Sequence, residues 1–197
     1  MKNIKHICFS LFFLISLLNS TFAKEKLPIT TTLTVHKSEK YGILTVSGII
    51  KAPKRIIWEA LTAQGSESCT HTKDILAYDI IKIDKKSKTI EAYYLIDFPW
   101  PFKDRWQVLH IKINKKTDKI SWKLKMGTIK RNTGYYHLEK IDKYSTRVNY
   151  KVEFDPGVKY VPRWIINYIA KLQAPKIIKN IRKCAKKKVS QIQACNF

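Results

Sequence analysis

Residues 145–185 read STRVNYKVEFDPGVKYVPRWIINYIAKLQAPKIIKNIRKCA, and two hydrophobic periods meet within this stretch. From Ser145 to Asp155 apolar and polar side chains alternate, which predicts a β-strand with one dry face. From Pro162 onward apolar residues recur every three or four positions, which predicts a long amphipathic helix. Residues 155–157, DPG, form the turn between the two, and Pro175 is expected to kink or interrupt the helix.

Strand-like patterns also fill most of the chain upstream. The predicted strands are residues 41–51, 75–84, 89–97, 102–114, 119–126, 128–140 and 145–155. Pro53 suits a first helical turn and is followed by apolar residues at helical spacing, so residues 53–63 are predicted to form a short helix. Residues 64–73 are polar and turn-like. Alternation on one face of successive strands is typical of an antiparallel sheet with one dry side.

The order of these elements decides the predicted fold. The chain has 197 residues, which favours one domain. A sheet with one apolar face must be covered, and only the last helix is long enough to cover it. We therefore predict an α+β fold of the helix-grip type, in which a curved antiparallel sheet of about seven strands wraps around a long C-terminal helix. The concave space between sheet and helix is a natural ligand cavity.

Two short segments resemble parts of the START lipid-transfer and polyketide-cyclase-like superfamily. Residues 99–106, PWPFKDRW, are similar to a segment in which prolines and an aromatic residue precede an Asp-Arg or Arg-Asp element at the head of a strand. Residues 161–167, VPRWIIN, are similar to the start of the final helix. The resemblance implies non-covalent binding or transfer of a hydrophobic ligand such as a phospholipid, sterol, polyketide or quinone-like molecule. A cyclase-type enzyme of the same fold is the alternative.

The amino terminus has the pattern of a secretory signal peptide. Two lysines precede a short apolar core, and residues 21–23, TFA, supply small residues before a cleavage site. The protein is therefore expected to be exported to the periplasm or secreted. The predicted organisation is a signal peptide at residues 1–23, a loose lead-in at 24–40, a START-like domain at 41–190 and a C-terminal tail at 191–197.

Three cysteines remain after the predicted cleavage, and thiols in an oxidising compartment tend to pair. Cys184 and Cys195 are eleven positions apart, one at the end of the helical stretch and one in the tail behind it. They are expected to form a disulfide, which leaves Cys69 free. No cysteine or histidine spacing indicates a metal site, and no cofactor is expected.

The chain is strongly basic, with 38 Lys+Arg against 15 Asp+Glu and a formal net charge of +23. Such a charge attracts anionic lipid surfaces and nucleic acids. Only six of the basic residues are arginines, which base-specific recognition prefers, and the lysines are scattered. The pattern favours a solvated surface on a monomer over nucleic-acid binding. Binding of anionic polymers or of a partner protein through this surface stays an alternative function.

The strand at residues 102–114 carries the main candidate for ligand recognition. If Lys112 faces water, alternation places Arg105 and Gln107 on the inner face, where a buried guanidinium needs a partner. Arg105 is expected either to pair with an aspartate, the candidates being Asp79, Asp97 and Asp104, or to bind an anionic group of the ligand. The residues expected to contact the ligand are Arg105, Gln107, Tyr94, Trp122, Tyr136 and Trp164.

The outer face of the last helix is rich in lysine. The residues expected to lie near an anionic membrane are Lys176, Lys179, Lys183, Lys186, Lys187 and Lys188, and the alternative is an ordinary solvated face. No catalytic residue is identified, because the histidines lie in unrelated segments and no nucleophile motif is present. The preferred function is therefore non-catalytic binding or transfer of a hydrophobic ligand.

Overall fold

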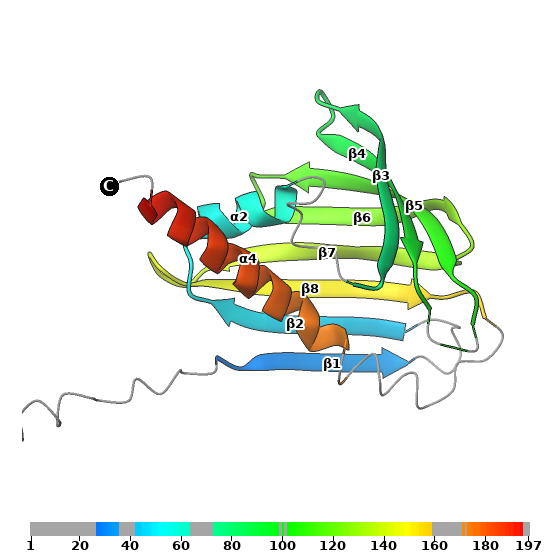
Figure 1. Cartoon of the computed structure of the whole chain (residues 1–197), viewed down its shortest axis with the longest axis horizontal. Helices are drawn as coiled ribbons and strands as arrows, with labels where there is room; N and C mark the ends of the chain where they lie inside the picture. Colours follow the sequence, from blue (N-terminus) through cyan, green and yellow to red (C-terminus); the bar gives the residue numbers. More distant parts are fainter. Residues whose placement is uncertain are drawn as a thin grey trace, which may run out of the picture.

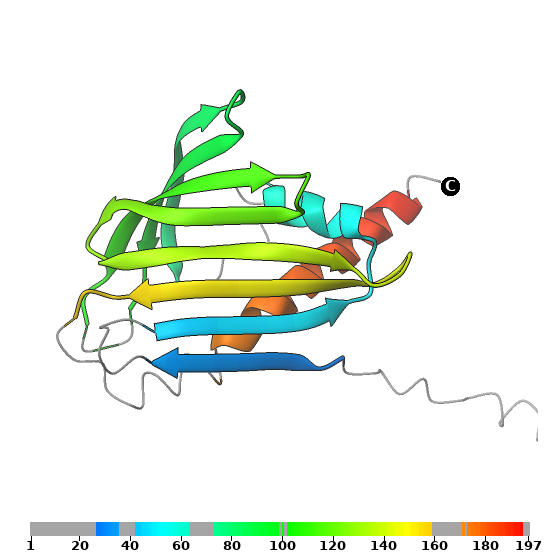
Figure 2. The same cartoon turned by 180° about the vertical axis from the view of Figure 1, so that it is seen from behind.

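A computed structural model describes residues 27–35, 42–63, 73–98, 100, 102–158, 171 and 173–194. These residues form one curved sheet with two α-helices on its concave side (Figures 1 and 2). The strands are β1 (Ile29–Val35), β2 (Gly42–Ile50), β3 (Ile75–Asp84), β4 (Thr89–Ile96), β5 (Arg105–Asn114), β6 (Lys119–Gly127), β7 (Arg131–Lys140) and β8 (Thr146–Asp155). The helices are α2 (Lys54–Thr62) and α4 (Ala174–Ala194).

The sheet is antiparallel throughout, in the order β1-β2-β8-β7-β6-β5-β4-β3. After β2 the chain passes through α2 and crosses to the far edge, where β3 begins. Each following strand then pairs with the one before it, until β8 closes against β2. This path confirms the α+β helix-grip prediction, and the strands predicted from alternation lie within three residues of the observed bounds.

One strand was not expected. The prediction of a loose lead-in over residues 24–40 is wrong for residues 29–35, which form β1 and pair along their length with β2. Ile29 and Leu33 pack against the core, while Thr30 and Thr32 between them are exposed. Threonine is favourable in strands, so a Thr-rich segment can form an edge strand when a neighbour is present to pair with it. The sheet therefore has eight strands rather than about seven.

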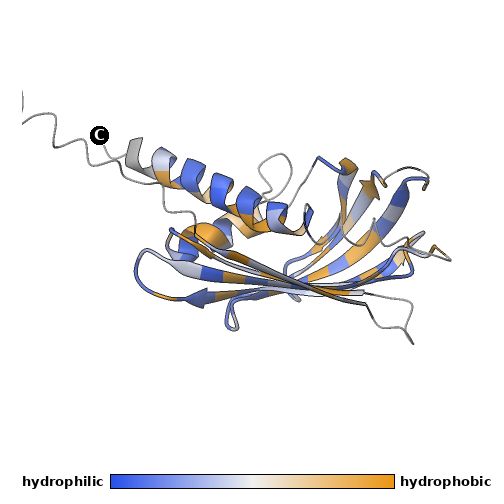
Figure 3. Ribbon diagram, turned by 90° about the horizontal axis from the view of Figure 1, so that it is seen from below, coloured by the Kyte–Doolittle hydropathy of each residue, from blue (hydrophilic) through white to orange (hydrophobic). Residues whose placement is uncertain are grey.

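The core lies between the sheet and the two helices. On α4 the fully buried residues recur at helical spacing, at Ala174, Ile178, Ile181 and Ala185. They belong to the same cluster as Ile56 and Ile57 of α2 and the inner residues of β2 and β8. Gly48 lets α4 approach closely, because a Cβ at this position would lie 2.7 Å from Cγ2 of Ile178. Figure 3 shows the apolar side of α4 turned to the sheet and its polar side turned outward.

Pro175 lies in the first turn of α4, where its missing N–H would have no helical partner in any case. Directly before it, Lys171 and Gln173 adopt π-helical geometry, a local irregularity that often accompanies a break in a helix. Residues 162–170 and 172, which the predicted helix includes, lie outside the described residues, so an interruption at Pro175 stays a prediction.

Cys184 is disulfide-bonded. Its expected partner, Cys195, lies outside the described residues, so the pairing of Cys184 with Cys195 stays a prediction.

The predicted signal peptide, residues 1–23, lies outside the described residues. Neither α2 nor α4 is long and apolar enough to span a membrane.

Candidate ligand site

The inner face of β5 carries the predicted recognition residues. Ile111 and Ile113 pack against the core, and Gln107 is bonded to residues of the same face, so alternation along β5 places Arg105 on this face as well. The neighbouring strand β4 sets Tyr94 opposite Gln107 and Ile96 opposite Arg105. The structure therefore brings Arg105, Gln107 and Tyr94 together at one end of the concave face.

A chain of buried amide hydrogen bonds crosses this face. The indole Nε1 of Trp122 donates to Oδ1 of Asn132 at 2.8 Å, and Nδ2 of Asn132 donates to Oε1 of Gln107, also at 2.8 Å. Gln107 and Asn132 are 3% and 8% exposed. Because each bond is made inside the protein, three side chains from β5, β6 and β7 are held in fixed positions.

Asn132 was not among the predicted site residues. Asn132 lies at an inward position of β7, as do Gly134, Tyr136 and Leu138. In the sequence, the sign of its role is a polar amide within a series of alternating positions that face inward. Gly134 allows the indole of Trp122 to lie across β7, since a Cβ there would be 2.5 Å from its Cζ2 atom.

Three aromatic rings form a cluster beside the amide chain. The ring centroids of Trp122, Tyr136 and Tyr150 lie between 5.0 and 5.6 Å apart. Burial raises the pKa of both tyrosine hydroxyls above the ordinary value, most strongly for Tyr136. All three side chains nevertheless keep some accessible surface, so they are surrounded by protein without being sealed into the core. Tyr150 extends the predicted set, which had included only Trp122 and Tyr136.

A second aromatic pair lies toward the β3 edge. The rings of Tyr78 and Tyr94 are 5.1 Å apart and tilted by 56°. Burial raises the pKa of both hydroxyls, and the carboxylate of Asp79 adds to the effect on Tyr78. Aromatic surface therefore covers both parts of the inner face, over β3 and β4 and over β6 to β8.

Arg105 has no aspartate partner. No ion pair joins it to any of the three expected carboxylates, of Asp79, Asp97 and Asp104, all of which belong to the described part of the chain. Its Nε atom is buried and has no hydrogen-bond acceptor. A buried donor without a partner costs about 1–3 kcal/mol, and more when it is charged. Of the two alternatives for Arg105, the ion pair with one of these aspartates is therefore not found among the described residues.

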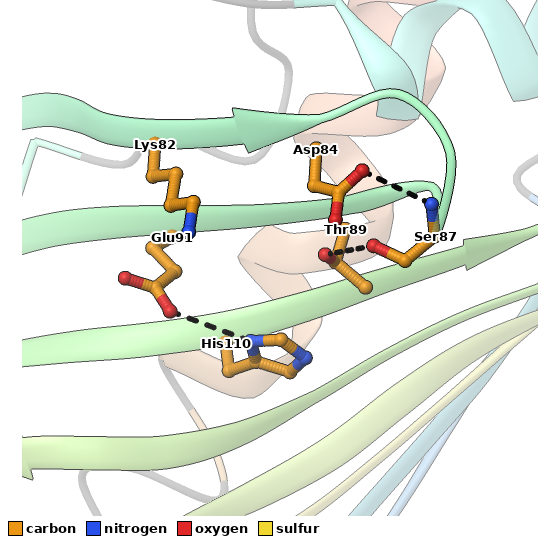
Figure 4. A pocket seen from close by; sticks show the side chains of 6 residues that line it. All are labelled: Lys82, Asp84, Ser87, Thr89, Glu91 and His110. Atoms are coloured by element: carbon orange, nitrogen blue, oxygen red, sulfur yellow. Dashed lines mark hydrogen bonds and ion pairs between the residues drawn. The ribbon is translucent and has the colours of Figure 1, made fainter.

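A small hollow of about 240 Å³ lies on the opposite, outer face of the sheet (Figure 4). It is lined by Lys82, Asp84, Ser87, Thr89, Glu91 and His110. Its carboxylates have partners in the protein: Asp84 accepts hydrogen bonds from the backbone N–H groups of Lys86 and Ser87, and Glu91 pairs with Lys125. A hollow lined by charged and hydroxyl-bearing side chains does not suit a hydrophobic ligand.

The other predicted residues are placed as follows. Trp164 lies outside the described residues. On α4, the side chains of Lys176, Lys179, Lys183, Lys186 and Lys187 are exposed and that of Lys188 is half-buried. Within the described ranges, no three histidine, cysteine or acidic side chains are grouped so that they could hold a metal ion.

No protein-family model matches this chain, and no curated protein matches it. Solved structures, however, do match this chain. The STAR-related lipid transfer protein of Xanthomonas axonopodis matches with a TM-score of 0.64 at 18% identity, over 82% of this chain and 98% of that one. The fold is the START-like helix-grip fold.

Two further helix-grip structures show how widely the fold is shared. Human StAR-related lipid transfer protein 5 matches with a TM-score of 0.58 at 10% identity, over 93% of this chain and 96% of that one. The Zhui aromatase/cyclase of Streptomyces sp. R1128 matches with a TM-score of 0.60 at 12% identity, over 76% of this chain and 96% of that one. At such identities the likeness establishes the fold, and the ligand must be argued from the site.

Proposed function

We propose that this helix-grip protein binds or transfers a hydrophobic ligand that carries an anionic group. The observation behind this proposal is the Nε atom of the Arg105 guanidinium, which is buried on the inner face and has no hydrogen-bond acceptor. A carboxylate or phosphate group would supply the missing acceptor in a charge-assisted hydrogen bond, and guanidinium groups suit both.

The apolar part of the ligand would lie along the aromatic surface. Trp122, Tyr136 and Tyr150 offer ring faces and edges that keep accessible surface, and the amide chain from Trp122 to Gln107 holds the indole in place. This arrangement has the general character of a ligand site, which is mostly apolar with a few fixed polar groups. A lipid-transfer protein and a cyclase among the structural neighbours are compatible with such a ligand.

The same proposal includes delivery at an anionic membrane after export. α4 carries six lysines and Arg182 and no acidic residue, and five of the lysines are exposed. A basic face on the helix that covers the concave side would bring the ligand site close to a lipid surface.

A comparison of two ligands tests the proposal. Purified wild-type protein is titrated with a fluorescent long-chain fatty acid and with the fatty alcohol of the same chain. The Arg105→Gln variant is expected to bind the acid at least tenfold more weakly and the alcohol unchanged, because hydrogen bonds to charged groups contribute about 1.5–3 kcal/mol. The matched control is Arg147→Gln, which removes an exposed arginine on the outer face of β8.

Equal loss of acid and alcohol binding would mean that Arg105 supports the fold rather than the ligand. Unchanged acid binding by Arg105→Gln, or no binding of either probe by the wild type, would contradict the proposal. Chemical conversion of the bound molecule would assign the protein to the enzymes of this fold instead.

A further inference from the structure

The amide chain on the inner face has a fixed direction, and Trp122 sets it. An indole N–H donates a hydrogen bond and accepts none. The atom of Asn132 that lies 2.8 Å from Nε1 of Trp122 is therefore its carbonyl oxygen, and its amino group points the other way, toward Gln107. Because an amide amino group also only donates, the atom of Gln107 that it meets is the carbonyl oxygen Oε1. One donor thus orients both carboxamides.

Burial makes this orientation hard to reverse. Gln107 and Asn132 are 3% and 8% exposed. Turning the carboxamide of Gln107 by half a rotation would set its amino group against the amino group of Asn132. Turning both carboxamides would set the amino group of Asn132 against the indole N–H of Trp122. Each reversal therefore leaves two donors facing one another without an acceptor, which is costly inside a protein.

This direction decides what Gln107 offers to a ligand. Its Oε1 atom already accepts from Asn132, and its Nε2 amino group has no acceptor in the part of the chain that the structure describes. Gln107 lies two positions after Arg105 on β5, so alternation places both side chains on the inner face. The Nε atom of Arg105 is likewise a donor without an acceptor. Two neighbouring inward positions of β5 thus present N–H donors.

We propose that Gln107 is a specificity-determining residue, which Trp122 and Asn132 orient so that it donates to an oxygen of the ligand that carries no hydrogen. The inference rests on the proposed binding of a ligand at this face and adds the class of group that is selected. A carboxylate or carbonyl oxygen satisfies the amino group of Gln107. Sites built around a fixed hydrogen bond discriminate strongly against groups that cannot complete it.

Two neutral probes separate the role of Gln107 from the charge of Arg105. One is a fluorescent long-chain methyl ketone, whose oxygen only accepts, and the other is the secondary alcohol of the same carbon skeleton, whose hydroxyl also donates. Gln107→Glu keeps the oxygen that Asn132 bonds and replaces the amino group with a second acceptor. The nearby guanidinium of Arg105 favours the ionised form of the introduced carboxyl group.

We expect Gln107→Glu to bind the ketone at least about tenfold more weakly, because two acceptors then face one another, and to bind the alcohol within about threefold of the wild type, because the hydroxyl donates to the new oxygen. The matched control, Thr133→Glu, introduces the same charge at an exposed position of β7 and is expected to change neither affinity. Equal losses of ketone and alcohol by Gln107→Glu, unchanged binding of both, or no binding of either by the wild type would overturn the inference.

These outcomes are distinct from failure of the proposed function, which is decided by the binding of fatty acid to Arg105→Gln. Selective loss of the acid by Arg105→Gln, together with no discrimination by Gln107→Glu, would leave the anion site standing and refute the role of Gln107. Selective loss of the ketone by Gln107→Glu, together with unchanged acid binding by Arg105→Gln, would support Gln107 and refute the anion site.

A second variant tests the orientation without adding a charge. Trp122→Phe keeps an aromatic ring and removes the indole N–H, so both carboxamides become free to turn and Gln107 presents either end to the ligand. The smaller ring weakens both probes alike, so the ratio of ketone affinity to alcohol affinity is the quantity compared. We expect this ratio to fall by about threefold relative to the wild type. An unchanged ratio would show that Trp122 does not orient Gln107 and would contradict the inference.

Discussion

Both the oxygen and the nitrogen of the Asn132 carboxamide form hydrogen bonds inside the protein, and this makes the inner face sensitive to its substitution. Its oxygen accepts from Trp122 and its nitrogen donates to Gln107, whose side chain is buried. Removing the amide leaves a donor and an acceptor without partners, and each such group costs about 1–3 kcal/mol when buried.

We therefore expect Asn132→Ala to lower the free energy of unfolding by about 2–4 kcal/mol, measured by urea denaturation. The control is Thr133→Ala, at the neighbouring exposed position of the same strand, which is expected to change it by less than about 0.5 kcal/mol. Equal effects of the two substitutions would show that the amide chain contributes nothing specific.

The tyrosines of the inner face predict a loss of stability in alkali. Burial raises the pKa of Tyr94, Tyr136 and Tyr150 above 10.0, the ordinary value. Above pH 10 the unfolded chain releases these protons while the folded protein retains them, so unfolding becomes more favourable as the pH rises toward the folded-state pKa. Below pH 10 both states keep the protons, and the contribution to stability is fully present.

Each such tyrosine is expected to lower the free energy of unfolding by about 1.4 kcal/mol per pH unit in this alkaline window. Urea denaturation at pH 9 to 11.5, with tyrosinate absorbance recorded in parallel, measures the slope. A Tyr136→Phe/Tyr150→Phe double variant keeps the rings and loses the hydroxyls, so its slope is expected to be shallower. The same slope in both proteins would contradict the assignment to these two groups.

Among the elements, α4 is joined to the edge of the sheet by hydrogen bonds from Arg182. Its Nε and Nη2 atoms donate to the carbonyl oxygen of Ile49 at 3.1 and 2.9 Å, and Nη2 also donates to the carbonyl of Leu27 at 3.1 Å. One side chain thus joins the closing helix to the end of β2 and to the residues that lead into β1. Hydrogen bonds from a charged group are among the stronger ones in proteins.

Arg182→Met keeps much of the apolar stem and removes the donors. We expect it to lower the free energy of unfolding by about 1.5–3 kcal/mol and to speed hydrogen exchange of the β1 amides more than of those in β7. Lys183→Met, at the exposed neighbouring position, is the control and is expected to leave β1 exchange unchanged. Uniformly faster exchange across the sheet would point to general destabilisation instead.

The elements differ in how far the sequence could predict them. β6 and β8 were predicted almost to the residue because alternation is a local signal that appears wherever one face is buried. β1 was missed because an edge strand rich in threonine depends on pairing with β2, which no local pattern encodes.

Part of the candidate ligand site was also predictable from the alternation of side chains along the strands. Alternation placed Gln107 and Trp122 on the inner face correctly, since the face that a side chain occupies follows from the period of the strand. It could not decide whether Arg105 meets an aspartate, because that contact depends on distances between strands. Asn132 was missed because its importance comes from two partners on other strands.

At the scale of the whole molecule, the question is whether the formal charge of +23 acts as a general field or through one face. A general field would attract an anionic surface in any orientation. The lysines of α4 are instead grouped on the outward side of the helix whose inner side covers the concave face (Figure 3). If the protein delivers a ligand to a membrane, this face should contribute more than an equal charge elsewhere.

Liposome co-sedimentation separates these two cases. Reversing four lysines of α4 to glutamate, at positions 183, 186, 187 and 188, is expected to weaken binding to vesicles of anionic lipid and to flatten its salt dependence, since each lysine near the surface contributes about 1 kcal/mol. The matched control reverses four exposed lysines on the outer side of the sheet and in a turn, at positions 112, 115, 116 and 123, with the same change in net charge. Binding by the control should remain close to that of the wild type. Equal losses in the two variants would show that the net charge acts as a general field. Unchanged binding by the α4 variant, or no binding by the wild type, would remove the membrane face from the proposed function. The ligand site would still be tested separately, by the binding of fatty acid to the Arg105→Gln variant.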